Sequence, residues 1–96
     1  MNQAVHNLIA EGRELASEAE QHAQSCHTKS EEHTLLLFES AILQAFINHL
    51  ESGEPIPDKF SQSAFLPVWG PTFFRSELKD FKTRLESFYK NHAQVA

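Results

Sequence analysis

The stretch Leu35-Leu36-Leu37-Phe38-Glu39-Ser40-Ala41-Ile42-Leu43-Gln44-Ala45-Phe46-Ile47-Asn48-His49-Leu50 decides the fold of this 96-residue chain. Placed on a helix at 100° per residue, its polar residues Ser40, Gln44 and Asn48 fall within one sector of about 80°. Apolar side chains fill most of the remaining circle, in which Glu39 is the main exception. An ordinary surface helix has an apolar stripe only a little wider than 100°. This helix is therefore predicted to have neighbours on several sides, and a second copy of the chain is the first candidate for one of them.

The composition predicts one soluble domain spanning residues 1–96. Apolar residues make up 41% of the chain and charged residues 22%, which argues against intrinsic disorder. No apolar run reaches about 18 residues, so we expect no membrane-spanning segment. Residues 1–6 lack the basic and apolar regions of a secretory signal, and the single cysteine, Cys26, cannot form an internal disulfide. These features predict a cytoplasmic protein with a reduced thiol.

The charges are unevenly distributed along the chain. Residues 1–54 carry nine acidic and two basic residues, a net charge of −7, whereas residues 55–96 carry four acidic and six basic residues, a net charge of +2. Because the acidic first half would repel nucleic-acid phosphates, we expect no direct nucleic-acid binding. The two halves are instead predicted to attract each other, either within one chain or across a dimer.

The first part of the chain is predicted to form a helical hairpin. A helix over about 2–26 presents a seam of small residues, in which Gly12 would allow the close approach of a neighbouring helix. A second helix covers about 29–52, with Thr28 as the N-cap of a capping box and Ser30 as the alternative cap. Gly53 occupies the position of a C-terminal cap. A single continuous helix over 2–52 remains an alternative, although a break at residues 25–30 is favoured.

The second part of the chain is predicted to add a short helical turn over 57–65 and an amphipathic helix over 71–91. The last helix has a strict apolar stripe with 4-3-4-3 spacing, formed by Phe74, Leu78, Phe81, Leu85 and Phe88. On its outer face, Asp80–Arg84 and Glu86–Lys90 are expected ion pairs at i, i+4. The tail from His92 onward is expected to fray. The predicted fold class is therefore all-α.

Motifs for a metal site or for catalysis are weak. Glu18, His22 and Cys26 follow one helical line at i, i+4, i+8 and are the best candidates for metal ligands or for a redox-sensitive thiol. No Cys-x-x-Cys or His-Glu-x-x-His motif accompanies them, so a histidine near a loop or a seam is favoured over a metal ligand. Glycine occurs only at positions 12, 53 and 70, which excludes a glycine-rich phosphate loop. We therefore expect no cofactor and no enzymatic activity.

The segment over 65–74 concentrates aromatic residues beside prolines. Stiff aromatic side chains are typical anchors of protein interfaces, so this segment is a candidate docking surface for another protein. The alternative is that it caps the open end of the hairpin and completes the core, which a small domain needs. The candidate partner-binding residues are Phe65, Leu66, Val68, Trp69 and Phe73.

These patterns together predict a small non-enzymatic interaction or regulatory protein that acts as a helical homodimer. The excess apolar surface of the second helix would pair around a two-fold axis, as in a four-helix bundle. Two alternatives remain, a metal- or redox-responsive module and an acidic inhibitor that mimics nucleic acid. The residues predicted to form the dimer interface are Leu36, Leu43, Phe46, Ile47 and Leu50.

Overall fold

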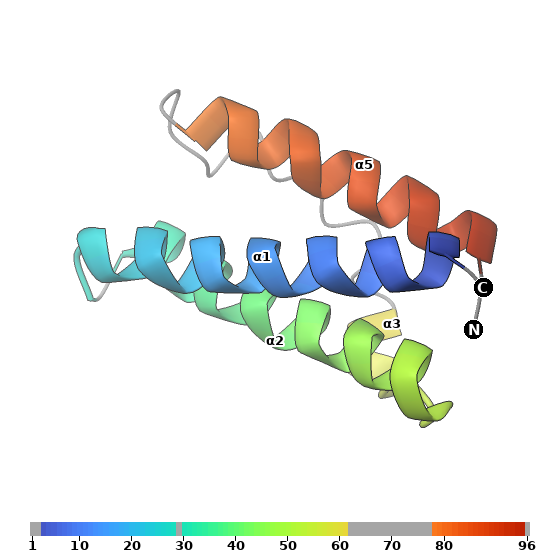
Figure 1. The fold of residues 1–96 in the computed structure, drawn as a ribbon. Coiled ribbons are helices and arrows are strands. Elements are labelled where there is room, and N and C mark those ends of the chain that lie inside the picture. The colour runs from blue at the N-terminus through green and yellow to red at the C-terminus, as the bar shows by residue number, and fades with distance from the viewer. Residues whose placement is uncertain (1–2, 29, 62–77, 96) are drawn as a thin grey trace.

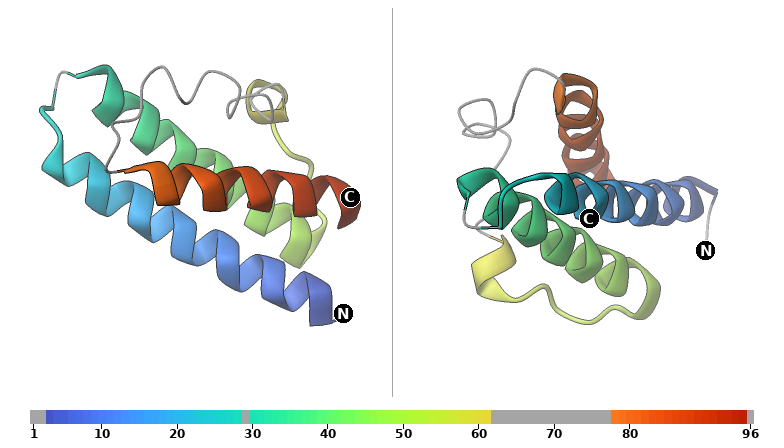
Figure 2. Two further views of the ribbon diagram at one scale, coloured as in Figure 1. Left: turned by 90° about the horizontal axis from the view of Figure 1, so that it is seen from above. Right: turned by 90° about the vertical axis from the view of Figure 1, so that its left-hand side faces the viewer.

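The computed structural model describes residues 3–28, 30–61 and 78–95, and within these ranges the regular structure is entirely helical. In chain order the helices are α1 (Gln3–Ser25), α2 (Glu31–Ser52), α3 (Asp58–Ser61) and α5 (Lys79–Val95). Figure 1 shows α1 and α2 as an antiparallel hairpin, with α5 running along α1 in the opposite direction. In the left view of Figure 2, α1 begins and α5 ends at the same end of the molecule. The predicted all-α class is confirmed.

The break between α1 and α2 is confirmed, but a different residue caps the second helix. Ser30, with extended backbone angles, accepts a hydrogen bond from the backbone N–H of His33 at 3.1 Å. The predicted N-cap, Thr28, lies outside the helix. The imidazole Nδ1 of His33 also donates to the carbonyl oxygen of Ala23 at 2.7 Å, which accepts a second hydrogen bond from the backbone N–H of Cys26 at 3.1 Å. One side chain thus ties the beginning of α2 to the end of α1.

The end of α2 follows the predicted glycine cap. Gly53 adopts the left-handed conformation with φ of 77°, and its N–H donates to the carbonyl oxygen of His49 at 2.8 Å. The short helical turn predicted over 57–65 is present as α3, whereas residues 62–65 lie outside the described ranges. The ring of Phe60 in α3 packs 5.7 Å from that of Phe38, measured between ring centroids.

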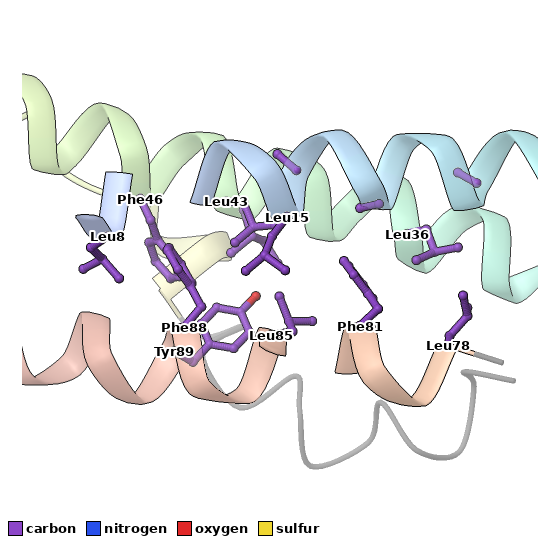
Figure 3. Close-up of a cluster of buried hydrophobic side chains, with 14 of the residues drawn as sticks. Leu8, Leu15, Leu36, Leu43, Phe46, Leu78, Phe81, Leu85, Phe88 and Tyr89 are labelled. Atoms are coloured by element: carbon purple, nitrogen blue, oxygen red, sulfur yellow. The ribbon is translucent and has the colours of Figure 1, made fainter. Parts of the chain in front are cut away.

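The core lies where α1, α2 and α5 meet, and small residues of α1 make the approach possible (Figure 3). Gly12 is buried, and its backbone faces the ring of Phe88 and the side chain of Ile47. Farther along α1 the same face carries alanines, which lets α2 and α5 lie close to it. The buried apolar side chains of α1 are Leu8, Ile9, Leu15, Ala16, Ala19 and Ala23.

The apolar stripe of the last helix is confirmed for Leu78, Phe81, Leu85 and Phe88, which are all buried. The first predicted residue of the stripe, Phe74, lies outside the described ranges, as does the predicted start at residue 71. The prediction that the tail frays from His92 is wrong, because α5 continues to Val95 and His92 is buried. His92 follows Phe88 by four residues, so it extends the stripe by one turn and docks on the core.

The opposite charges of the two halves meet within one chain. Arg84 of α5 forms salt bridges with two glutamates of α1, Glu18 and, at 3.0 Å, Glu14. On the surface of α5 itself, Lys82 and Glu86 form an i, i+4 pair at 2.9 Å. Arg84 was expected to pair along its own helix with Asp80 and instead reaches across to α1. Because these groups are partly exposed to solvent, each pair contributes less than about 1 kcal/mol.

The contact at Gly12 leads to a first prediction. A Cβ atom at this position would lie 3.0 Å from Cε2 of Phe88 and 3.1 Å from Cγ1 of Ile47. The branched side chain in Gly12→Val would force these rings and methylenes apart, so we expect the free energy of unfolding to fall by about 1–3 kcal/mol. Urea denaturation followed by circular dichroism would measure this loss of stability.

Ser17→Val, on the exposed side of the same helix, is the matched control and should change stability by less than about 0.5 kcal/mol. Equal effects of the two substitutions would contradict the close approach.

Candidate functional site

A carboxyl group is buried in the centre of the contact between α2 and α5. Glu39 has no exposed surface, and its Oε2 accepts a hydrogen bond of 2.7 Å from the Tyr89 hydroxyl. Its other oxygen, Oε1, is buried without a hydrogen-bond partner in the described part of the chain. Burial raises the pKa of Glu39 to about 8, an effect that the hydrogen bond from Tyr89 only partly opposes. Glu39 is therefore predominantly neutral at pH 7.

The hydroxyl group of Tyr89 lies in the same buried environment as Glu39. Burial raises the pKa of Tyr89, and the negative charge that Glu39 can carry raises it further. Tyr89 thus remains protonated throughout the physiological range and always has a proton to donate. Figure 3 shows its hydroxyl oxygen directed toward the side of the core formed by α1 and α2. The position of Tyr89, next to Phe88 on the buried stripe, fixes this direction.

A cluster of aromatic rings continues from Tyr89 toward the end of α5. The ring of Phe46 from α2 lies 5.6 Å from that of Tyr89 and 4.1 Å from that of His92, measured between centroids. His92 has 7% of its surface exposed, and its Nε2 is buried without a hydrogen-bond partner among the described residues. Burial lowers the pKa of His92, and the charge of His49 lowers it further.

His49 links this cluster to the end of α2. Its ring lies 6.3 Å from the ring of His92 in a stacked arrangement. Its Nδ1 donates to the carbonyl oxygen of Glu54 at 2.9 Å, just beyond the glycine cap. His49 therefore has a fixed orientation and stays accessible to solvent at one edge, whereas His92 is enclosed.

The site places two titratable groups inside the core. Glu39 and His92 are both titratable, and both are enclosed by the contact between α2 and α5. In this closed arrangement a substrate cannot reach either group without displacing α5. The site consequently resembles a polar element of the core more than a catalytic cleft.

The three candidate metal ligands each have a different neighbour. Glu18 is bound to Arg84, the ring of His22 packs edge-on against Phe81 at 5.6 Å, and Cys26 Sγ lies 3.7 Å from Oε2 of Glu32. Within the described ranges, no group of three or more histidine, cysteine, aspartate or glutamate side chains is arranged to hold a metal ion. Glu18 and His22 lie one turn apart on α1 as predicted, whereas Cys26 lies just beyond the end of the helix, and each of the three contacts a different side chain.

Four of the five residues predicted to form a dimer interface belong to the core of a single chain. Leu36, Leu43, Phe46 and Ile47 are buried by contacts within the monomer, and Leu50 is half-buried. The physical reason for this burial is the small-residue face of α1, which lets α2 pack closely against it while α5 covers the adjoining sector. An interface on α2 has to use the opposite side of the helix.

The predicted partner-binding residues lie outside the described ranges, so their role stays a prediction. These residues are Phe65, Leu66, Val68, Trp69 and Phe73.

The sequence analysis missed the pair formed by Glu39 and Tyr89, although it contained a signal for it. Glu39 stands within the apolar sector of its helix, and an acidic residue there needs a polar partner in the core. Identifying Tyr89 as that partner requires the three-dimensional register of α5 on α2, which no spacing in the sequence specifies. His92 was similarly recognisable as one more turn of the apolar stripe.

Comparisons with protein-family models, with curated proteins and with solved structures found no match. Within the described residues, no helix combines the length and the apolar character needed to cross a membrane.

The buried hydrogen bond leads to a second prediction. Tyr89→Phe would leave Glu39 with neither oxygen bonded, so we expect a loss of about 1–3 kcal/mol in the free energy of unfolding. Replacing both partners by apolar residues, in Glu39→Met with Tyr89→Phe, should be less destabilising than the sum of the two single substitutions, because no buried polar group is then left unpaired. Urea denaturation of all four proteins at pH 6 would give this coupling energy. Additive effects would show that the two side chains do not interact.

Proposed function

We propose that this chain is a non-enzymatic protein that acts as a helical homodimer through the outer face of α2. The observation that carries the proposal is the absence of charge on that face. Between residues 33 and 50, Glu39 is the only acidic residue and there is no lysine or arginine. Because Glu39 is buried, the solvent side of α2 presents no formal charge over about five turns.

The composition of the outer face supports contact with another helix. Its exposed residues are Thr34, Leu37, Gln44 and Asn48. Leu37, at 45% exposure, is the large apolar side chain that stands out to solvent in the described part of the chain. The centres of protein interfaces are depleted of charged residues in the same way.

Small residues on the same face would let a second helix approach closely. Ala41 and Ala45 are half-buried and lie one turn apart, on the side of α2 that adjoins Leu37. Two copies of α2 related by a two-fold axis would bring these alanines together and cover Leu37. The apolar excess that the sequence indicates would then be divided between the core and this interface.

The other long helices differ from α2 in their outer faces. The exposed side of α1 includes Arg13, Glu14 and Glu20, and that of α5 includes Lys79 and Lys90. Charged residues at these positions are typical of helices that face water. The uncharged face is consequently a particular property of α2.

The dimer is favoured over the two alternatives because no specific observation within the described residues supports either of them. The candidate metal ligands are engaged with other side chains, as described above. Part of the acidic surface that a nucleic-acid mimic would need is neutralised within the chain, since Glu14 and Glu18 pair with Arg84, and Glu51 with Arg13. A regulatory role through a further protein partner rests on the aromatic segment over 65–74 and remains part of the proposal.

The test is the molecular mass in solution at micromolar concentration. By light scattering coupled to size exclusion, the wild-type chain should have twice the 10.9 kDa mass of one copy. Leu37→Glu would bring two negative charges together in an interface that excludes water, so we expect this variant to be a monomer with unchanged helicity.

Ser17→Glu adds the same charge to the exposed side of α1 and serves as the control, which should leave the dimer intact. A wild-type mass of 10.9 kDa would refute the dimer. A dimer that survives Leu37→Glu would move the interface away from this face.

A further inference from the structure

We propose that the docking of α5 onto the hairpin of α1 and α2 is a pH-gated latch, in which Glu39 of α2 and His92 of α5 must both be uncharged for α5 to stay in place. The latch is independent of the proposed dimer, because its groups are enclosed within one chain and lie on the opposite side of α2 from Leu37.

Each of the two groups is enclosed by the opposite helix. Glu39 belongs to α2, and its hydrogen-bond partner is the hydroxyl of Tyr89 on α5. His92 belongs to α5, and its ring rests on Phe46 of α2 at 4.1 Å. Both side chains are more than nine-tenths buried, and each has one polar atom without a partner in the described ranges. Movement of α5 away from the hairpin would expose both groups to water.

The charges around Glu39 leave it without a compensating cation. Tyr89 of α5 offers a neutral hydroxyl. On α1, Glu18 is bound to Arg84, and Glu20 accepts a hydrogen bond of 2.9 Å from Ser40. An ionised Glu39 would thus be a buried negative charge with a single hydrogen bond, which strongly favours an open, hydrated arrangement.

The surroundings of His92 also leave its cation without compensation. From α2 the titratable neighbour is His49, whose positive charge would repel it. From α1, Gly12 contacts Phe88, one turn before His92, and carries no side chain. Arg13 of α1 and Glu51 of α2 form a salt bridge with each other. No carboxylate acts to raise the pKa of His92, so an imidazolium there would be buried against the rings of Phe46 and Phe88 without a compensating anion.

The two groups respond to pH in opposite directions. The pKa of Glu39 is about 8 when docked and 4.5 when exposed, so undocking releases a proton between these values. Each pH unit upward in this range shifts the equilibrium tenfold toward the undocked state. The docked His92 has a pKa below its exposed value of 6.5, so undocking takes up a proton below pH 6.5. Each pH unit downward, as far as the docked pKa, also shifts the equilibrium tenfold toward undocking.

The two effects cancel over a defined interval. Below pH 6.5, and above both 4.5 and the docked pKa of His92, undocking releases one proton and takes up another. The contribution of these two groups to docking is therefore level in this interval. Above pH 6.5 only Glu39 contributes to the pH dependence, so the docked state of α5 becomes less stable as the pH rises toward 8. Undocking would uncover the buried face of the hairpin, including Leu15, Leu43 and Phe46 (Figure 3).

The test is amide hydrogen exchange of α5 between pH 4.5 and 8, corrected for the intrinsic exchange rate. In Glu39→Gln only the histidine remains, so the opening constant of α5 should fall tenfold per pH unit between the docked pKa of His92 and 6.5 and then stay level. In His92→Phe only the carboxyl remains, so the constant should rise tenfold per pH unit from 4.5 to 8. The wild-type constant should be level between the docked pKa of His92 and pH 6.5 and should rise above pH 6.5. The exposed substitutions Glu31→Gln and His6→Gln are matched controls that should reproduce the wild-type profile.

A titration of the wild-type protein followed by nuclear magnetic resonance tests the latch without any substitution that might prevent folding. The carboxyl carbon of Glu39 should titrate well above 4.5, and the ring of His92 below 6.5. Titration of either group at its exposed value would overturn the proposal. The same pH dependence of the opening constant in the wild type, in Glu39→Gln and in His92→Phe would overturn it as well.

Discussion

The close approach of α1 to its two neighbours is the constraint on which the rest of the structure depends. Gly12 brings the backbone of α1 against Phe88 of α5 and Ile47 of α2 at once. Alanines at 16, 19 and 23 continue this narrow face toward the turn. Because α1 is thin along this line, α2 and α5 can both lie against it and still touch each other through Phe46, Phe88 and Tyr89. The buried polar pair exists only because this contact closes over it.

The sequence contained enough information to predict the helical elements and most of the buried stripe. Periodicity located Leu78, Phe81, Leu85 and Phe88, and glycine chemistry located the end of α2 at Gly53. These predictions succeed because spacing along a helix and the preference for a left-handed cap are local properties. The choice of cap at the other end was less certain, since Thr28 and Ser30 both satisfy the local pattern. The hydrogen bond to His33 distinguishes them only in three dimensions.

Which side of α2 enters the core could not be predicted from α2 alone. The apolar residues of this helix extend around most of its circumference, so its own pattern allows several orientations. The small-residue face of α1 selects one of them and draws Leu36, Leu43 and Phe46 inward. The candidate site depends on the same choice, because Glu39 shares their side of the helix. A prediction of the site therefore required the packing of three helices, while a prediction of the elements required only one helix at a time.

The buried pair of Glu39 and Tyr89 also constrains how α5 can be placed. Apolar side chains along α5 recur at nearly regular intervals, so a shift by one turn would still bury leucine and phenylalanine. Such a shift would move the Tyr89 hydroxyl by about 5.4 Å and leave Glu39 buried without its hydrogen bond. An unpaired buried polar group costs about 1–3 kcal/mol, a large fraction of the stability of a small domain. The pair thus disfavours shifted arrangements that hydrophobic contacts alone would tolerate. The same dependence on a neutral carboxyl makes the position of α5 sensitive to pH, so specificity of packing and sensitivity to protons have one physical origin.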